Sequence, residues 1–257
     1  MDTTKLQSLF DMTGRVVIVT GGTRGIGRSL AEGYAAAGAK VVVASRKQDA
    51  VDETAAHLRD DLGADAIGVA AHMGDLDDLH TIVERAVDAF GGIDVVVNNA
   101  ATALAQPVGE YTPDAWAKSL DVNLRGPVFL TQEALPHLKE SSHAAVLNVL
   151  SGAAFMFSSF VSMYAIGKAG LLAGTRAAAA ELAPHGIRVN AMAPGTVNTD
   201  MVRANTPEMQ EVMSQVMLLQ RMADPDEMVG PALMLTSDAG SFITGQVLLV
   251  DGGMVPH

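Results

Sequence analysis

Short apolar runs alternate along the chain with longer segments in which polar and apolar residues are mixed. Most of the runs are rich in β-branched residues and almost continuously apolar, as strands are when helices cover both faces of a parallel sheet. The seven strands that this pattern predicts are residues 15–20, 40–45, 66–71, 93–98, 144–150, 187–192 and 246–250. The segments between them are long enough for crossover helices, and residues 28–38 form one that ends on a glycine suited to a C-cap.

The alternation of strand and helix predicts a doubly wound α/β fold, with a seven-stranded parallel sheet flanked by helices. The 257 residues contain no internal repeat, low-complexity tract or Pro/Ser-rich linker. A single domain over residues 1–257 therefore accounts for the whole length. Ligands in such folds bind beyond the carboxyl ends of the strands, so the residues that follow each run are the candidates for a functional site.

The composition excludes several classes of function. Lys and Arg number 17 against 29 Asp and Glu, and the resulting net charge of −12 is a poor match for nucleic acid or an anionic membrane surface. Because cysteine is absent, disulfides, thiolate metal ligands and cysteine nucleophiles are excluded, and we expect no metal site. Residues 1–10 do not resemble a signal peptide, and no run approaches the ~18 apolar residues of a membrane helix, so we expect a cytoplasmic protein.

A glycine-rich turn with the spacing Gly-x3-Gly-x-Gly follows the first predicted strand. Gly21 permits the tight turn, Gly25 lets the backbone approach a pyrophosphate, and Gly27 lets the next helix pack on the sheet. The amino end of that helix offers unpaired amides and a positive dipole end to phosphate. The alternative is an ordinary tight connection, but the position directly after the first strand favours dinucleotide binding.

Residues 20–27, with the sequence TGGTRGIG, resemble the TGxxxGxG turn of the short-chain dehydrogenase/reductase family. Further motifs like those of the family, and of its 3-oxoacyl-reductase branch, follow in the same order as far as Gly253, so the resemblance covers nearly the whole chain. It implies a Rossmann-like fold and hydride transfer between a nicotinamide cofactor and a small ketone or secondary alcohol.

The cofactor favoured by the sequence is NADP(H), with NAD(H) as the alternative. The second predicted strand ends on Ser45-Arg46, without the carboxylate that would bind the ribose hydroxyls and repel a 2′-phosphate. The Arg46 guanidinium can pair with a phosphate bidentately, and Arg24 lies within the glycine turn. In the family a basic residue at either place accompanies NADP(H). The alternative is that both arginines are ordinary solvated charges.

The resemblance implies the rest of the cofactor site. The family usually has an acidic residue beside the adenine where this chain has His72, so His72 or the Met73 amide is expected to take over that contact. The Val197 amide and Thr199 are expected to hold the nicotinamide carboxamide. The complete predicted cofactor set is Gly21, Thr23, Arg24, Gly25, Ile26, Gly27, Ser45, Arg46, His72, Met73, Asn99, Ala100, Tyr164, Lys168, Pro194, Gly195, Val197 and Thr199.

Four residues match the catalytic set of the family. Tyr164 is the only one of the three tyrosines with a lysine four positions later, Lys168, and such residues share a helix face. A nearby ammonium lowers the pKa of a phenol from its usual ~10. Such a pair alone is a common accident, but Ser151 precedes it at the spacing of the family serine, and Asn123 matches the fourth residue.

The resemblance also assigns a role to each of these residues. Tyr164 is expected to exchange the proton with the carbonyl oxygen, and Ser151 to hold that oxygen. Lys168 is expected to tune the phenol and bind the nicotinamide ribose. Asn123 is expected to distort a helix and hold a water linked to Lys168.

The sequence says less about the substrate. Five residues that follow the fifth strand are expected to face the cleft and suggest an apolar substrate, although some of them are expected to belong to the core: Ala153, Phe155, Met156, Phe160 and Met163. Residues 195–230 are expected to form a substrate lid. Met209, Met213 and Met217 recur at every fourth position within it, on one helical face. This stripe either lines the pocket or packs the lid on the body.

Other functions stay open at this point. A 3-oxoacyl thioester reductase that accepts an acidic carrier protein needs a basic patch, for which Arg125 and Arg176 are the candidates. A catalytically silent dinucleotide-binding protein is disfavoured because Tyr164 and Lys168 are both present. Epimerases of the extended branch are longer and have a differently spaced glycine turn. Homodimers or homotetramers are common in the family, and residues 165–183 and 242–250 suit either an interface or the core.

Overall fold

The computed structural model describes residues 2–157, 159 and 161–255. Its seven strands form one parallel sheet in the order β3-β2-β1-β4-β5-β6-β7. The strands are β1 (Val16–Thr20), β2 (Lys40–Ser45), β3 (Ala66–Ala70), β4 (Val95–Asn98), β5 (Ala145–Val149), β6 (Arg188–Pro194) and β7 (Val247–Val250). The predicted fold class is confirmed. The predicted strands differ from these mainly at their ends, since β4 begins later and β6 runs on to Pro194.

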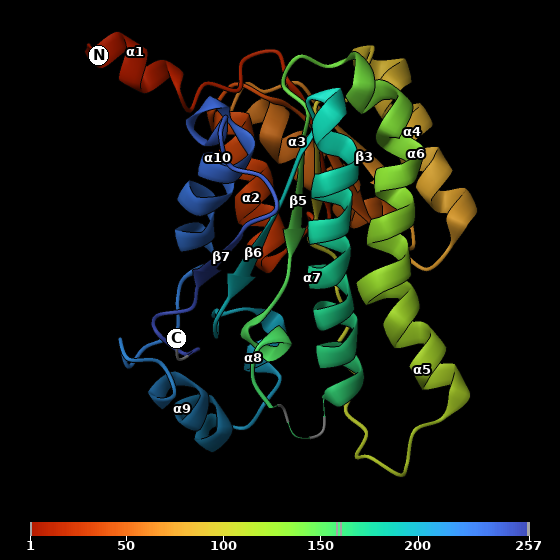
Figure 1. Cartoon of the computed structure of the whole chain (residues 1–257), viewed down its shortest axis with the longest axis vertical. Coiled ribbons are helices and arrows are strands. Elements are labelled where there is room, and N and C mark those ends of the chain that lie inside the picture. Colours follow the sequence, from red (N-terminus) through yellow and green to blue (C-terminus); the bar gives the residue numbers. More distant parts are fainter. Residues whose placement is uncertain (1, 158, 160, 256–257) are drawn as a thin grey trace.

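Helices cover both faces of the sheet (Figure 1). One face packs against α2 (Gly25–Ala36), α3 (Gln48–Asp60) and α10 (Val229–Thr236), and the other against α4 (Leu76–Phe90), α6 (Gly126–Glu140) and α7 (Ser162–Leu182). The remaining α-helices are α1 (Thr3–Ser8), α5 (Pro113–Leu120), α8 (Asp200–Arg203) and α9 (Pro207–Gln215). In the described part of the chain, no helix has both the length and the apolar character needed to span a membrane.

The strand β1 contributes to two hydrophobic cores. Val17 and Val19 pack in the core under α2, α3 and α10, while Val16 and Ile18 pack in the core under α4, α6 and α7. All four side chains are buried. Successive side chains of a strand point to opposite faces of the sheet, so a strand covered on both faces must be apolar throughout. This explains the continuous apolar runs of the sequence.

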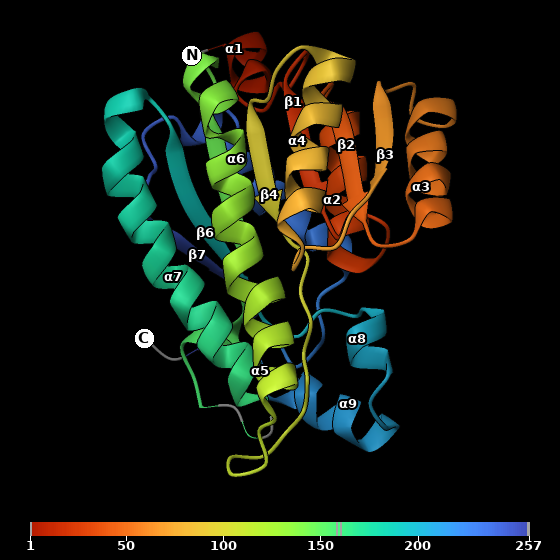
Figure 2. The ribbon, with the colours of Figure 1, turned by 90° about the vertical axis from the view of Figure 1, so that its right-hand side faces the viewer.

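The strand order reverses between β1 and β4, because β2 and β3 lie on one side of β1 and β4 to β7 on the other. Ligands of doubly wound folds bind in the crevice outside the carboxyl ends of the strands at such a switch point. The arrowheads of β5 and β6 in Figure 1 point toward the end of the molecule where α9 lies. Helices α8 and α9 lie together beyond that end of the sheet (Figure 2).

Candidate active site

The turn between β1 and α2 leaves no room for side chains at its glycines. A Cβ atom on Gly27 would lie 2.2 Å from the carbonyl oxygen of Gly21 and 2.4 Å from Nδ2 of Asn99. Gly21 and Gly25 have φ angles of 65° and 52°, in the left-handed region that favours glycine. Each of the three glycines predicted from the sequence therefore has a steric reason to be glycine.

The amino end of α2 is free to receive an anion. Its N-cap residue, Arg24, makes no side-chain cap, which leaves the amides of the first turn available to an anion. Asn99 braces the turn, since its Nδ2 donates to the carbonyl oxygen of Thr20 at 2.8 Å. The backbone amides of Asn99 and Ala100 donate to the Thr20 hydroxyl at 3.0 and 3.1 Å. This cradle of glycines and amides fits the pyrophosphate of a dinucleotide.

The residues expected at the adenosine ribose gather beside the same turn. The Thr23 hydroxyl donates to the Ser45 hydroxyl at 3.2 Å, which joins the glycine turn to the end of β2. Arg46 follows Ser45 and is exposed. The Arg24 side chain is also exposed, and its Nη1 lies 3.6 Å from a carboxylate oxygen of Asp200. The hydrogen bond between Thr23 and Ser45 thus joins the two segments that carry the predicted phosphate-binding arginines.

The loop that follows β3 folds back on itself. The Gly74 amide donates to Nδ1 of His72 at 3.1 Å, and the His72 amide donates to the Asp78 carboxylate at 2.7 Å. A neutral His72 ring in this arrangement carries its proton on Nε2, which is left as a hydrogen-bond donor. Met73 is buried, and a Cβ atom on Gly126 would lie 2.2 Å from its carbonyl oxygen. Helix α6 therefore begins directly against this loop.

Helix α7 places Lys168 at the end of β5. Its Nζ donates to the carbonyl oxygen of Val149 at 2.6 Å and lies 5.7 Å from the ring centre of Tyr164. The side chain is almost wholly buried, with 1% exposed. Burial lowers the pKa of Lys168 to about 8, because a charged ammonium is disfavoured away from water.

Tyr164 and Ser151 meet beside that lysine. Ser151 lies two residues after the end of β5 and accepts a hydrogen bond from the Ala153 amide at 3.2 Å. Burial raises the pKa of Tyr164, so the lowering expected from Lys168 is wrong, and only the nearby Ser151 hydroxyl opposes the rise. A serine hydroxyl, a phenol and an ammonium thus lie together at the carboxyl end of the sheet, which is an arrangement suited to proton transfer.

Asn123 lies in a π-helical turn, Asp121–Arg125, between α5 and α6, so the helix distortion expected there is present. Its side-chain amide donates to the Thr102 carbonyl at 2.7 Å, and its oxygen accepts from the Thr102 amide at 3.1 Å. A Cβ atom on Gly167 would lie 2.9 Å from Cβ of Asn123. The π-helical turn therefore packs against α7 between Tyr164 and Lys168.

The segment after β6 reaches the glycine turn at Thr199. Pro194 ends β6, and a Cβ atom on Gly195 would lie 2.7 Å from the Asp251 carbonyl oxygen. Val197 is buried and forms an isolated β-bridge with Ala223. The methyl group of Thr199 lies 3.0 Å from the position of a Cβ atom on Gly25. Of the predicted cofactor residues in this segment, Thr199 thus contacts the glycine turn, while Gly195 and Val197 pack against Asp251 and Ala223.

Comparisons with known proteins agree with this geometry. A family model described as Enoyl-(Acyl carrier protein) reductase matches residues 21–255. Human Dehydrogenase/reductase SDR family member 4 is 36% identical over 245 residues, which cover 94% of this chain and 88% of the human protein. The chain belongs to the short-chain dehydrogenase/reductase family.

Other members of the family are equally similar. L-rhamnose 1-dehydrogenase (NAD(P)(+)) of Azotobacter vinelandii is 37% identical over 246 residues, covering 93% of this chain and 96% of that protein. A protein of Beutenbergia cavernae assigned as an NAD(P)-dependent gluconate 5-dehydrogenase has a crystal structure with NADP at low occupancy. It is 36% identical, with a TM-score of 0.89, and the match covers 96% of this chain and 98% of that one. As a family member, this chain is an oxidoreductase that acts between alcohol and carbonyl groups.

The residues expected on the substrate side divide into two groups. Ala153 and Met156 are partly exposed and Phe155 is 38% exposed, so they remain available to a substrate. Met163 has no exposed surface, and the expectation that it faces the cleft is wrong because it packs in the core. Phe160 lies outside the described residues.

The methionine stripe of the lid is interrupted. Helix α9 ends at Gln215, so the prediction that Met217 continues one helical face is wrong. The chain turns there toward the C-terminal segment, where the Leu219 amide donates to the Gly252 carbonyl at 3.1 Å. Met209 is 50% exposed whereas Met217 is 3% exposed. The stripe therefore packs the lid at one end and meets solvent at the other.

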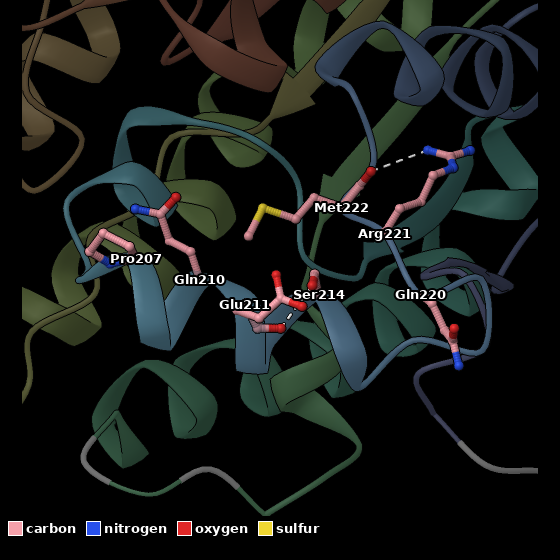
Figure 3. Close-up of a pocket in the computed structure, with 7 residues that line it drawn as sticks. All are labelled: Pro207, Gln210, Glu211, Ser214, Gln220, Arg221 and Met222. Carbon is pink, nitrogen blue, oxygen red and sulfur yellow. Dashed lines mark hydrogen bonds between the residues drawn. The ribbon is translucent and has the colours of Figure 1, made fainter.

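A hollow of about 430 Å³ lies between α9 and residues 220–222 (Figure 3). Its lining residues are Pro207, Gln210, Glu211, Ser214, Gln220, Arg221 and Met222. This set shares no residue with the predicted catalytic and cofactor sets. Arg221 is already paired with the Glu227 carboxylate at 2.7 Å. We therefore place the candidate active site of this family member at the ends of β1, β4 and β5, and not in this hollow.

Three buried polar side chains behind the site are joined by hydrogen bonds that the sequence analysis did not predict. Asn98 Nδ2 donates to Asn148 Oδ1 at 2.9 Å, and Asn148 Nδ2 donates to the Thr175 hydroxyl at 2.9 Å. All three residues are buried. These hydrogen bonds link β4, β5 and α7, the helix that carries Tyr164. An asparagine inside the otherwise apolar run 144–150 was the available signal, because a polar residue there needs a buried partner.

Proposed function

We propose that this chain is an NADP(H)-dependent oxidoreductase of an apolar ketone or the corresponding secondary alcohol. The observation that carries the proposal is the meeting of Ser151, Tyr164 and Lys168 at the carboxyl end of β5. In this family member the three groups lie at the same end of the sheet as a phosphate cradle that fits a dinucleotide. Both halves of the reaction, cofactor binding and proton transfer, therefore have a site at the same end of the sheet.

The proton chemistry is assigned to Tyr164. A bound nicotinamide cofactor supplies the hydride for reduction and accepts it in oxidation. Tyr164 donates its phenolic proton to the carbonyl oxygen during reduction and takes a proton from the alcohol in the reverse direction. Ser151 donates a hydrogen bond to the same oxygen as negative charge develops there. The Lys168 ammonium stabilises the phenolate that remains and binds ribose hydroxyls, and Asn123 holds a water that relays protons to it.

Two exposed arginines support NADP(H) as the preferred cofactor. Arg24 and Arg46 flank the Thr23–Ser45 hydrogen bond, and a guanidinium pairs bidentately with a phosphate. Residues 45–48, SRKQ, contain no carboxylate that would repel a 2′-phosphate. The remaining predicted cofactor residues hold the pyrophosphate, the adenine and the carboxamide as the family resemblance implies. The NADP bound by the Beutenbergia protein is in line with this choice.

Exposed apolar side chains on the segment after β5 and on residues 195–230, the proposed lid, favour an apolar substrate. The exposed ones are Phe155, Phe157, Met201, Met209, Val212, Val216, Leu218 and Leu219. A substrate that covers them removes apolar surface from water. A carrier-protein thioester has less support, because Arg125 is held by Asp121 at 3.1 Å and by the Gly74 carbonyl at 2.7 Å.

A screen of NADPH oxidation tests the proposed reaction. The panel contains apolar ketones, quinones, sugars and acyl thioesters at equal concentration. We expect apolar ketones or quinones to give a kcat/KM at least about tenfold above the sugars and thioesters. Even a small additional apolar contact with the substrate changes kcat/KM by about that factor. A preference for sugars, as the names of two relatives indicate for those proteins, contradicts the apolar pocket. Cofactor binding without turnover of any class contradicts catalysis itself.

We also propose that the protein works as a homodimer or homotetramer. The strand β7 lies at the edge of the sheet and is only partly buried, and Phe242 beside it is fully exposed. An open sheet edge next to an exposed aromatic ring is a surface that proteins usually cover. Sedimentation velocity tests this, and a single monomeric species at micromolar concentration contradicts it.

A further inference from the structure

The carboxylate of Asp200 faces one of the two arginines proposed to hold the 2′-phosphate. Asp200 begins α8, and its Oδ2 lies 3.6 Å from Nη1 of Arg24. Its Oδ1 lies 2.9 Å from Nη2 of Arg203. The Arg24 and Asp200 side chains are 69% and 54% exposed. This ion pair joins the glycine turn to the segment that Thr199 brings against Gly25.

Asp200 is a permanent negative charge at this place. The hydrogen bond from Arg203, and to a smaller extent the charges of Arg203 and Arg24, hold the pKa of Asp200 below its usual value. The carboxylate therefore stays ionised throughout the neutral range. It attracts the Arg24 guanidinium and repels any further negative charge that approaches the same arginine.

A 2′-phosphate would need the guanidinium that Asp200 already contacts. The planar guanidinium of Arg24 presents N–H donors whose geometry suits a carboxylate or a phosphate. Arg46 is placed differently, because it follows β2 and forms no ion pair within the described part of the chain. The two arginines are thus unequal, since a carboxylate competes with a phosphate for Arg24 and none competes for Arg46 within the described part of the chain.

We propose that Asp200 is a specificity-determining residue for the cofactor, which lowers the preference for NADP(H) over NAD(H) by competing with the 2′-phosphate for Arg24. This inference rests on the proposed function, in which Arg24 contacts that phosphate. Binding of NADP(H) separates Arg24 from Asp200, whose carboxylate keeps Arg203. NAD(H) carries no 2′-phosphate and leaves the ion pair in place. Because exposed ion pairs are weak, Asp200 reduces the preference without reversing it.

The test measures cofactor binding to the whole protein without substrate. Titration calorimetry gives the Kd of NADPH and of NADH for the wild type and for Asp200→Asn. We expect the substitution to tighten NADPH by about threefold to fivefold, the range that an exposed ion pair supplies. The Kd of NADH should change by less than about twofold, because NADH does not use Arg24 in this way. Asp200→Ser serves as a second variant, with circular dichroism to confirm that both are folded.

Two control variants separate a local effect from a general one. Glu211→Gln makes the same change in net charge on α9, where the carboxylate accepts a hydrogen bond from Gln215 at 2.8 Å, and it should leave the ratio of the two Kd values unchanged. In an Arg24→Ala background, Asp200→Asn should no longer tighten NADPH, since the competition has been removed. Raising the salt concentration to about 0.5 M should shrink the effect of Asp200→Asn, because the ion pair is exposed.

The outcomes distinguish this inference from the proposed function. Equal tightening of NADPH and NADH by Asp200→Asn overturns the role of Asp200, and so does tightening that persists without Arg24. An unchanged NADPH Kd overturns it as well. If Arg24→Ala and Arg46→Ala both leave the preference for NADPH over NADH unchanged, the NADP(H) proposal itself fails. If those arginines matter and Asp200→Asn has no effect, only the inference about Asp200 fails.

Discussion

The ammonium of Lys168 donates a hydrogen bond to the carbonyl oxygen of Val149 at 2.6 Å. This contact ties the middle of α7 to the last residue of β5, just before Ser151 in the chain. It also fixes a charged group in the interior, where burial holds its pKa at about 8. The group proposed to activate Tyr164 is therefore held in place at a cost to folding stability.

Replacing Lys168 by methionine is expected to stabilise the fold at pH 7. The fall of the lysine pKa from 10.5 to about 8 corresponds to roughly 3 kcal/mol against the charged form. Losing the hydrogen bond to Val149 offsets about 1 kcal/mol of this gain in the stability of the variant. Urea unfolding should therefore show Lys168→Met to be more stable by about 2 kcal/mol, while turnover falls by at least about a thousandfold.

The same variant gives a signed dependence on pH. Between pH 8 and 10.5 the unfolded wild type binds more protons than the folded one, so wild-type stability rises with pH across this window. The advantage of Lys168→Met should shrink over the same window and give way above it to a disadvantage of about 1 kcal/mol, because only the lost hydrogen bond to Val149 then remains. A destabilisation of equal size at pH 7 and pH 10 contradicts the burial of a charged lysine.

Carbonyl reduction is expected to decline above about pH 8. Burial raises the pKa of Tyr164, so the phenol keeps its proton through the neutral range. Lys168 loses its charge as the pH passes about 8, and a neutral amine no longer stabilises the phenolate left by proton transfer. The pH profile of kcat/KM measures this. A profile that stays level to pH 10 excludes Lys168 as the group that tunes Tyr164.

Arg46→Ala is expected to weaken NADPH selectively. Loss of a bidentate phosphate contact should raise the KM for NADPH by about tenfold or more and the KM for NADH by less than about twofold. Lys47→Ala is the matched control, because Lys47 is the next residue and is also exposed. Steady-state kinetics with both cofactors measure the effect. Equal changes for NADPH and NADH are incompatible with a 2′-phosphate contact.

Gly27→Ala is expected to damage the phosphate cradle. The added methyl group would lie 2.2 Å from the Gly21 carbonyl oxygen, so the turn must open, at a cost of about 1–3 kcal/mol. Thermal unfolding should report that loss, and calorimetry should show cofactor affinity reduced by about tenfold or more. Gly92→Ala is the control, because nothing lies within 4 Å of its added Cβ. An unchanged Kd for Gly27→Ala contradicts a cofactor cradle at this turn.

The features that the sequence predicts well are those written in local patterns. The strands are recognisable because burial on both faces makes each run continuously apolar, as in β1. The Tyr164–Lys168 pair is recognisable because positions i and i+4 share a helix face. Gly27 is recognisable because its place after a strand and before a helix already implies a close approach.

The features that the sequence does not predict depend on how distant segments meet. The pairing of Arg24 with Asp200 requires the segment after β6 to lie over the glycine turn, which no local pattern encodes. Helix α9 ends before Met217, and the residues that follow it bond to Gly252 near the C-terminus, a contact between distant segments. Met163 has the same apolar character whether it faces the cleft or the core, so only the structure places it in the core.

The most direct test of the proposed catalytic role is Tyr164→Phe, assayed for NADPH binding and for turnover of the best substrate from the screen. The substitution removes only the phenolic oxygen. We predict a loss of kcat of at least about a thousandfold, with the Kd of NADPH changed by less than about twofold. A variant that keeps most of its turnover, or that loses cofactor binding and turnover together, would contradict Tyr164 as the proton donor.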